Sequence, residues 1–262
     1  MNCRGALALA LILAGCQTAS VSFTNSKFSP DDSVRVEGIW GLLARPQGNG
    51  PFPAVVILHT CGGMTPHVTI DWPGYLTGLG YVTLSVDSLG PRGHKICTEM
   101  AVREMQQASD AYGALDYLAT LPYVDVQRVA VMGFSMGAVT INNILVRRFR
   151  KSSERDFKAA IALYGHCNGL NYEPGDIPVM EIVAEHDWLH TLTCVAVGKR
   201  SPVEVHVIPG AYHSFDSITS SGGYDPSGTY MQYSAQATSK ARELTKAFLG
   251  RTLGRPGVAD ER

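Results

Sequence analysis

Short apolar runs recur along the chain and alternate with segments of helical period. The runs are continuous, as in strands buried on both faces of a parallel sheet, and they cover residues 54–58, 81–86, 129–132, 159–164, 178–184 and 203–208. Apolar residues with helical spacing lie between or after them, at 105–118, 138–145 and 237–248. The alternation predicts an α/β fold with a doubly wound, mostly parallel sheet flanked by helices. Residues 36–46 alternate more between apolar and polar side chains, which predicts an antiparallel first strand.

The first residues have the pattern of an export signal. One basic residue, Arg4, precedes an apolar stretch over residues 6–14 that is too short to span a bilayer and ends in small residues. We therefore expect a signal peptide over residues 1–15. The motif "LAGC" at 13–16 resembles the bacterial lipobox, which implies cleavage before Cys16 and acylation of that cysteine. An ordinary secretory signal that happens to contain a cysteine is the alternative, and export follows in both cases.

Domain boundaries follow from composition. Residues 16–33 are polar, Ser/Thr-rich and without an apolar period, so we expect a tether there. The folded domain is expected over residues 34–250, followed by a flexible tail over 251–262. Gln17 rather than Asp follows the lipobox cysteine, which implies sorting of the lipoprotein to the periplasmic face of a Gram-negative outer membrane.

Charge narrows the class of partner. The 22 Lys and Arg residues balance 23 Asp and Glu residues, which leaves a net charge of −1. This balance gives no electrostatic reason to expect nucleic acid or an anionic membrane surface as a partner. We therefore expect a small-molecule partner, with membrane contact through the N-terminal lipid only.

A serine between two glycines follows the apolar run 129–132. Ser135 lies between Gly133 and Gly137, and a helical pattern comes next. In a parallel sheet, a sharp strand-to-helix turn places its apex residue at the carboxyl edge, where ligands bind. The flanking glycines avoid collisions with the neighbouring strand and helix. The pattern predicts a nucleophile, and a serine that only caps the helix is the alternative.

Partners for such a serine lie on later loops, first an acid and then a histidine. Asp187 follows the run 178–184, and His213 follows the last run, so both are expected to complete a catalytic triad. Glu185 and Asp216 are rival candidates for the acid. The imidazole would take the serine proton, and the carboxylate would hold the imidazole in the right tautomer.

Attack on an ester creates an oxyanion that backbone N–H groups stabilise. One donor is expected at Met136, directly after the serine. The other is expected in the loop after residues 54–58, where Cys61 or Gly62 would donate. His59 lies in the same loop and precedes the nucleophile, so we interpret it as a residue that braces the loop.

The motifs together resemble the dienelactone hydrolase family of α/β-hydrolases. They are "LHTCGG" at 58–63, "VDSLGPRG" at 86–93, "GFSMGA" at 133–138, "EHD" at 185–187 and "GAYHSF" at 210–215. The resemblance covers about residues 34–250 and implies a sheet of about eight strands. It also implies a monomeric hydrolase without a cofactor, which acts on a small ester or lactone through Ser135, Asp187 and His213.

This chain departs from the founding members of the family at two points. Those enzymes use a cysteine nucleophile, and they carry a glutamate where this chain has Thr60 and Cys61. Dienelactone itself is therefore not the expected substrate. Arg92, in the "GPRG" segment, is a candidate to meet a substrate carboxylate. Pairing with Asp87, or capping of a carbonyl, is the alternative role for this arginine.

The cysteines predict disulfides in an exported domain. Once Cys3 leaves with the signal and Cys16 is acylated, the remaining cysteines are Cys61, Cys97, Cys167 and Cys194. In the strand order that the resemblance implies, the third strand neighbours the fourth, and the sixth neighbours the seventh. We therefore predict Cys61–Cys97 and Cys167–Cys194, because each pair leaves one sheet edge from adjacent strands. Buried free thiols are the alternative.

Two other functions remain open. The segment "HDWLH" resembles the H-E-x-x-H zinc signature, which would make His186 and His190 ligands of a zinc hydrolase. That motif needs one helix across both histidines. The second alternative is a lipid-anchored binding protein without turnover, because a fold does not prove an activity. The sequence favours the serine esterase, with no metal.

Overall fold

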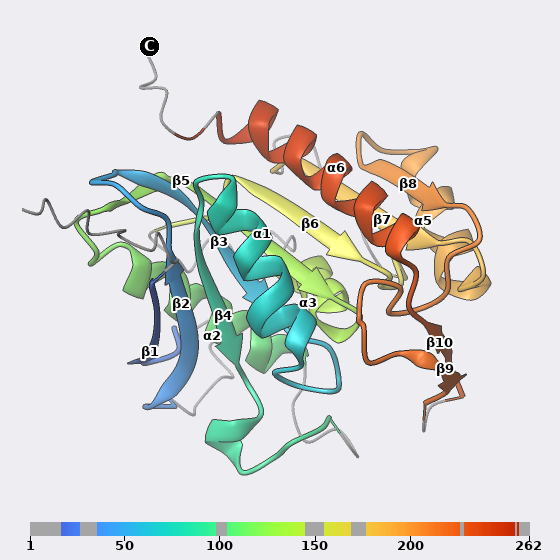
Figure 1. The fold of residues 1–262 in the computed structure, drawn as a ribbon, viewed down its shortest axis with the longest axis horizontal. Coiled ribbons are helices and arrows are strands. Elements are labelled where there is room, and N and C mark those ends of the chain that lie inside the picture. The colour runs from blue at the N-terminus through green and yellow to red at the C-terminus, as the bar shows by residue number, and fades with distance from the viewer. Residues whose placement is uncertain are drawn as a thin grey trace, which may run out of the picture.

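The computed structural model describes residues 17–26, 36–97, 104–144, 155–168, 177–225, 228–254 and 256. Its strands are β1 (Gln17–Phe23), β2 (Ile39–Arg45), β3 (Phe52–Leu58), β4 (Val82–Asp87), β5 (Val124–Phe134), β6 (Ala159–Leu163), β7 (Val179–Ala184), β8 (Glu204–Ile208), β9 (Ser221–Tyr224) and β10 (Tyr230–Gln232). Its helices are α1 (Trp72–Gly78), α2 (Glu104–Leu118), α3 (Met136–Ile144), α5 (Trp188–Gly198) and α6 (Ala235–Thr252), with short helical turns η1 (His67–Asp71) and η2 (Gly90–Arg92). Figure 1 shows how they enclose a twisted sheet.

The main sheet has eight strands in the order β1-β2-β4-β3-β5-β6-β7-β8. β2 pairs antiparallel with both β1 and β4. The other pairs, from β4 through β8, are parallel. The predicted α/β fold with a doubly wound, mostly parallel sheet is confirmed. All the parallel strands end at one edge, where the loops that carry the candidate residues begin.

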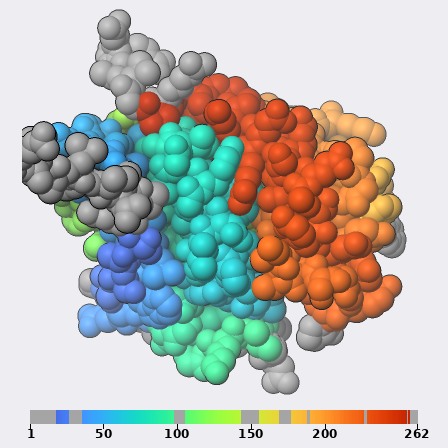
Figure 2. Space-filling model, viewed as in Figure 1, coloured from blue at the N-terminus to red at the C-terminus, as the bar shows by residue number. Residues whose placement is uncertain are grey.

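Helices cover both faces of the sheet. Val55 and Ile57 of β3 belong to the same core as Trp72 of α1, whereas Val56 belongs to the core that contains Tyr112 of α2. Successive strand side chains point to opposite faces, so one continuous apolar run fills two cores. α1 and α6 lie side by side on one face of the sheet, and Figure 2 shows them in turquoise and red. The Tyr75 hydroxyl of α1 donates to the Arg242 carbonyl of α6 at 2.8 Å.

The expected N-terminal tether is wrong for its first described residues. Gln17–Phe23 forms β1 and pairs along its length with β2. Phe23 is buried, and Val21 is half-buried between exposed Ser20 and Ser22. Apolar and polar side chains alternate over only a few positions of this strand. The polar, Ser/Thr-rich composition of the segment therefore gave no clear signal of a strand. Cys16, the signal peptide and residues 27–33 of the predicted tether lie outside the described residues.

The C-terminal boundary also differs from the expectation. α6 continues to Thr252, and Leu253 is buried against the core, so the domain does not end at residue 250. Most of the predicted tail, 255 and 257–262, lies outside the described residues. Within the described ranges, no helix is both long enough and apolar enough to cross a membrane.

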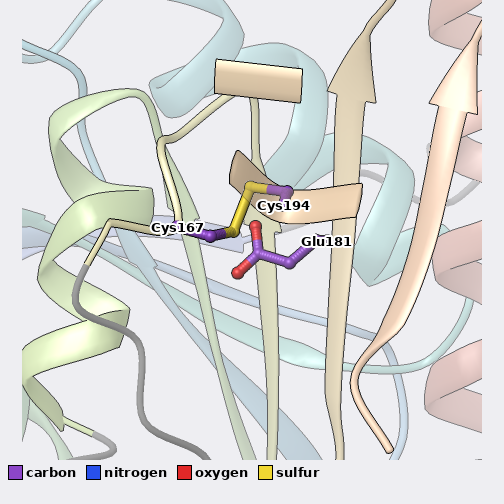
Figure 3. Close-up of side chains that lie close together, drawn as sticks. All are labelled: Cys167, Glu181 and Cys194. Atoms are coloured by element: carbon purple, nitrogen blue, oxygen red, sulfur yellow. A yellow bond between two sulfur atoms is a disulfide. The ribbon is translucent and has the colours of Figure 1, made fainter. Parts of the chain in front are cut away.

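Both predicted disulfides are confirmed. Cys61 bonds to Cys97, and Cys167 bonds to Cys194, each with a Cα separation of 4.8 Å. The first joins the loops after β3 and β4, and the second joins the loop after β6 to helix α5. Figure 3 shows the second disulfide with the carboxyl group of Glu181, from β7, beside it.

Candidate active site

Ser135 lies at the apex of the turn from β5 to α3. Its φ is 50°, in the left-handed region, and its N–H donates to the Leu163 carbonyl at 3.0 Å. A Cβ at Gly133 would lie 2.2 Å from the carbonyl oxygen of Gly137, and a Cβ at Gly137 would lie 2.5 Å from that of Leu58. Only glycine fits at either position, because both contacts are to backbone atoms. The packing that the motif requires is therefore present.

Ser135, His213 and Asp187 form one hydrogen-bonded chain. The Ser135 Oγ lies 2.9 Å from Nε2 of His213, and Nδ1 of the same ring lies 2.6 Å from Oδ2 of Asp187. A carboxylate only accepts, so Nδ1 carries the proton and Nε2 is free to accept from the serine hydroxyl. The imidazole is thus held in the tautomer that a general base needs.

A second histidine contacts the same carboxylate. Nδ1 of His190, on α5, lies 2.9 Å from Oδ2 of Asp187. Burial alone would raise the pKa of Asp187, but the hydrogen bonds from His190 and His213 outweigh it and lower the pKa to about 2. The carboxylate is therefore ionised at neutral pH. Asp187 precedes α5 as its N-cap, yet its side chain makes no capping bond and turns to the histidines instead.

The rival acids have other partners. Glu185 accepts a hydrogen bond from the Gly210 N–H at 2.7 Å, which ties the loop after β8 to the loop after β7. Asp216 accepts from the Trp72 indole at 2.6 Å and from the Tyr164 hydroxyl at 2.7 Å. Asp187 is thus the one of these three carboxylates with a described hydrogen bond to His213.

Tyr164 packs against the ring of His213, and Asp216 in turn accepts a hydrogen bond from Tyr164. The sequence pattern did not predict this supporting role. The Tyr164 ring lies edge-on to that of His213, with centroids 4.9 Å apart. Its hydroxyl and the Trp72 indole both donate to Asp216, which is buried. Burial raises the pKa of Tyr164 well above its ordinary value, so the hydroxyl stays a donor. Only the strand-end position of Tyr164 could have suggested its place.

The loop after β3 lies beside the serine turn. β3 and β5 are parallel neighbours, with Leu58 opposite Gly133. The Gly62 N–H donates to the Thr60 hydroxyl at 3.0 Å, so Cys61 is the better candidate on this loop for an oxyanion donor. The Cys61 carbonyl accepts from the Cys97 N–H at 3.0 Å, which adds to the disulfide in holding this backbone. Met136, the other predicted donor, is the first residue of α3.

His59 is a buried brace within this loop. Nδ1 contacts the Thr60 carbonyl at 2.6 Å and therefore donates, while Nε2 accepts from the Ser88 N–H at 3.1 Å. Burial lowers the pKa of His59, which favours this neutral form. The His59 carbonyl accepts from the Gln107 amide at 3.2 Å. These contacts agree with the bracing role predicted for this residue.

Arg92 is engaged within the protein. Its guanidinium meets both carboxylate oxygens of buried Asp110, at 2.8 and 3.0 Å, and also donates to the Ser88 carbonyl at 2.8 Å. Asp87, the partner considered from the sequence, instead accepts from backbone N–H groups of Leu89 and Gly90. The geometry favours the structural alternative, with Asp110 in place of Asp87. A role for Arg92 in substrate binding stays a prediction.

The zinc-like segment does not form the helical motif that it resembles. α5 begins at Trp188, so His186 precedes the helix, and its ring stacks on Tyr212 with centroids 4.5 Å apart. The ligand atoms that do converge, within 4.8 Å of one another, belong to Asp187, His190 and His213. The alternative of a zinc site formed by His186 and His190 on one helix is therefore not supported by the geometry.

An open cavity of about 560 Å³ adjoins the acid end of the triad. Its lining residues are His186, Asp187, His190, Tyr212, Tyr224, Gly228, Thr229 and Tyr230. They come from the loops after β7 and β8, from α5, and from the β9–β10 hairpin, which Figure 1 shows near the start of α6.

Part of this chain is similar in sequence to known esterases. The chain is 31% identical over 163 residues to the esterase FrsA of Klebsiella pneumoniae (strain 342), covering 58% of this chain and 36% of FrsA. It is 32% identical over 124 residues to the esterase EstD of Thermotoga maritima, covering 45% of this chain and 29% of EstD. The matches thus span about a third of the length of these relatives.

Solved structures share the fold. A putative dienelactone hydrolase from Klebsiella pneumoniae matches with a TM-score of 0.64 at 18% identity, over 89% of this chain and 99% of that one. The dienelactone hydrolase-like promiscuous phosphotriesterase P91, from metagenomic libraries, matches with a TM-score of 0.64 at 20% identity, over 92% and 100%. The family model named "Dienelactone hydrolase family" matches residues 39–253. This match covers most of the chain, which therefore belongs to the dienelactone hydrolase family.

Proposed function

We propose that the protein is a serine hydrolase that cleaves a small carboxylic ester or lactone through an acyl-enzyme intermediate. The observation that carries the proposal is the chain of hydrogen bonds from the Ser135 hydroxyl through His213 to Asp187. Family membership supports it, as do relatives named as esterases.

The reaction proceeds in two halves. The Ser135 Oγ attacks the substrate carbonyl while Nε2 of His213 takes the hydroxyl proton. Backbone N–H groups of Cys61 and Met136 stabilise the oxyanion, and His213 then returns the proton to the leaving alcohol. In a lactone that alcohol stays attached to the acyl chain. Water, activated by His213, finally releases the acid and restores Ser135.

Each triad residue has a distinct task. Asp187, ionised because its pKa is about 2, stabilises the imidazolium that forms on His213 during attack. No step needs a redox group or a metal ion, since proton transfer and the oxyanion donors account for the chemistry.

Substitution of the triad tests the proposal. Ser135→Ala and His213→Ala should each lower kcat for a short-chain ester by several orders of magnitude, because the residues act as a unit. Ser201→Ala, which lies after the end of α5 and outside the site, is the matched control and should keep its activity. Activity retained by a folded Ser135→Ala protein would refute the mechanism.

The alternatives predict other outcomes in the same assay. A zinc hydrolase would lose activity in EDTA, whereas the serine enzyme would not. A binding protein would show no turnover in wild type. Export with acylation of Cys16, and residence at the periplasmic face of the outer membrane, complete the proposal and rest on the N-terminal sequence alone.

A further inference from the structure

Aromatic rings form a continuous wall in the cavity beside the triad. His186 stacks on Tyr212 at 4.5 Å between centroids, Tyr212 meets Tyr230 edge-on at 4.9 Å, and Tyr230 meets Tyr224 edge-on at 5.2 Å. All of these residues line the cavity of about 560 Å³. Tyr224 is 76% exposed although it is a large aromatic side chain. Its free ring surface thus stands beside an open cavity.

This wall is fixed relative to the catalytic histidine. The Gln232 N–H of β10 donates to the His213 carbonyl at 3.3 Å, and His213 forms a parallel bridge with Met231. Tyr212 directly precedes His213 in the chain. The same cavity is lined by Asp187 and His190, whose side chains bond to each other. A group held there would lie at the acid end of the triad, because the lining includes Asp187 and does not include Ser135.

The charge of the lining selects against anions. Asp187 is the carboxylate of the described lining, which contains no lysine or arginine. Arg92, the arginine considered from the sequence as a carboxylate ligand, already makes a bidentate pair with Asp110. The remaining surface consists of ring faces, hydroxyl groups and imidazoles. Such a surface suits a flat, uncharged ring, because aromatic pairs gain from edge-to-face and offset contacts.

We infer that this cavity is a subsite for an uncharged aromatic ring that the ester carries in its acyl or its alcohol part. The inference rests on the proposed function and specifies its substrate class. Because Asp187 lines the cavity and Ser135 does not, the aromatic ring of the substrate is expected to be joined to the ester group through a spacer.

A substrate series with matched variants tests the subsite. The acyl arm compares ethyl hydrocinnamate with ethyl butyrate, and the alcohol arm compares phenethyl acetate with butyl acetate. Tyr224→Ala should lower kcat/KM about five- to tenfold for the ring-bearing ester of one arm and leave its aliphatic partner unchanged. Tyr224→Phe, which keeps the ring, should behave as wild type. Ile70→Ala, which removes another exposed apolar side chain, is the control.

The outcomes separate the subsite from the proposed function. If wild type hydrolyses none of these esters, the proposed function itself is refuted. Normal aliphatic turnover with no selective effect of Tyr224→Ala in either arm would overturn the subsite alone. A larger effect on an acetylated methyl glucoside than on both ring-bearing esters would also overturn it, since the wall would then hold a sugar. The arm that responds identifies which part of the ester carries the ring.

Discussion

One oxygen of Asp187 accepts hydrogen bonds from two imidazoles, His213 and His190. Two charge-assisted bonds to one carboxylate hold it more firmly than the single bond that a triad requires. The side chain of Asp187 gives up the capping bond that aspartate commonly makes at the start of a helix. His190 therefore acts as a positioning residue, because it holds Asp187 in place and acts on the reacting atoms only through that carboxylate.

Asp187→Asn should lower kcat on the order of 10⁴-fold, because an amide can hold the imidazole in the wrong tautomer. Glu185→Gln is the control, since Glu185 bonds to the Gly210 N–H instead. Steady-state kinetics with a short aliphatic ester measures both. A greater loss in Glu185→Gln than in Asp187→Asn would show that the acid is misassigned.

His190→Leu should lower kcat for a short aliphatic ester by about tenfold with little change in KM, since it removes a charge-assisted bond to Asp187. His190→Gln can still donate and should recover much of the activity. The split between kcat and KM, together with the rescue by glutamine, distinguishes positioning from a general packing defect. Equal activity in wild type and His190→Leu would exclude the positioning role.

The sequence predicts the three triad residues because each follows an apolar run in a fixed chain order. It does not predict the His190 contact, which depends on where α5 begins. The histidine spacing instead suggested a zinc motif, and the helix start at Trp188 removes His186 from it. The Tyr164 to Asp216 bond joins residues 52 positions apart, so no local pattern could reveal it.

Among the elements, α5 connects the site to the second disulfide. Its first turn follows Asp187 and carries His190, and Cys194 lies one turn further along. Cys194 bonds to Cys167 in the loop after β6, where the Cys167 N–H also donates to the Thr193 hydroxyl at 3.1 Å. The tether therefore fixes the helix that positions the acid of the triad.

The Cys167–Cys194 disulfide joins residues 27 positions apart in the sequence. Removing it in the double variant Cys167→Ala/Cys194→Ala should lower the free energy of unfolding by about 3 kcal/mol, as expected for a loop of this length. Its kcat should fall as well, under conditions where the protein remains folded, because α5 is less constrained. Urea unfolding and kinetics measure the two effects. Cys61→Ala/Cys97→Ala is the comparison, and it should affect the oxyanion loop instead. Unchanged stability and kcat in the first variant would contradict this account.

Strands were more predictable than helices. Apolar runs locate β3, β4, β6, β7 and β8 within about two residues, because strands buried on both faces need continuous apolarity. For β5, the run at 129–132 marks only part of a strand that begins at Val124. The sequence pattern does not predict α1, because this helix contains Pro73 and Gly74. It does not predict α5 either, because threonines and valines interrupt the helical period. The β9–β10 hairpin is short, with a Ser-Gly-Gly-Tyr first strand that has no apolar pattern. These elements form because of their contacts with the rest of the fold, and not because of a local sequence pattern.

At the scale of the whole molecule, a buried ionisable group, Glu181, lies on β7, beside the edge strand β8. Glu181 of β7 is buried next to the Cys167–Cys194 disulfide (Figure 3), and its Oε1 has no hydrogen-bond partner. Burial raises the pKa of Glu181 well above its ordinary value. Burial therefore favours the neutral carboxyl in the folded protein, where an unpaired charge would be very costly.

This burial predicts a pH-dependent stability. Below the ordinary pKa of glutamate both states hold the proton, and the contribution is fully present. As the pH rises further, the unfolded chain ionises first, so stability falls by up to about 1.4 kcal/mol per pH unit until the folded pKa of Glu181 is passed. Glu181→Gln should remove this loss, so the difference in free energy of unfolding between the variant and wild type should change in favour of the variant as the pH rises above the ordinary pKa of glutamate.

Urea unfolding over that pH range measures the difference. Glu243→Gln is the control, because the Glu243 side chain is 72% exposed and should show no such trend. A difference between wild type and Glu181→Gln that is constant with pH would contradict a neutral Glu181 in the folded state.

Export is the other prediction at this scale. Cys16→Ser should accumulate as unprocessed precursor in a Gram-negative host, since the lipobox cysteine is the residue that is acylated. Membrane fractionation and intact-mass measurement of the wild type should find a lipidated N-terminus at the outer membrane. Equal membrane retention of mature wild type and mutant would argue against lipidation.

The central claim is that Ser135 is the nucleophile of an ester hydrolase, and covalent labelling tests it most directly. Wild type should react with a fluorophosphonate probe in the presence of EDTA, with loss of ester hydrolysis in proportion to labelling, and peptide mapping should place the adduct on Ser135. The folded Ser135→Ala protein should not be labelled, and His213→Ala should be labelled far more slowly, because the hydroxyl has lost its base. An adduct at another residue, or no adduct in active wild type, would contradict the account.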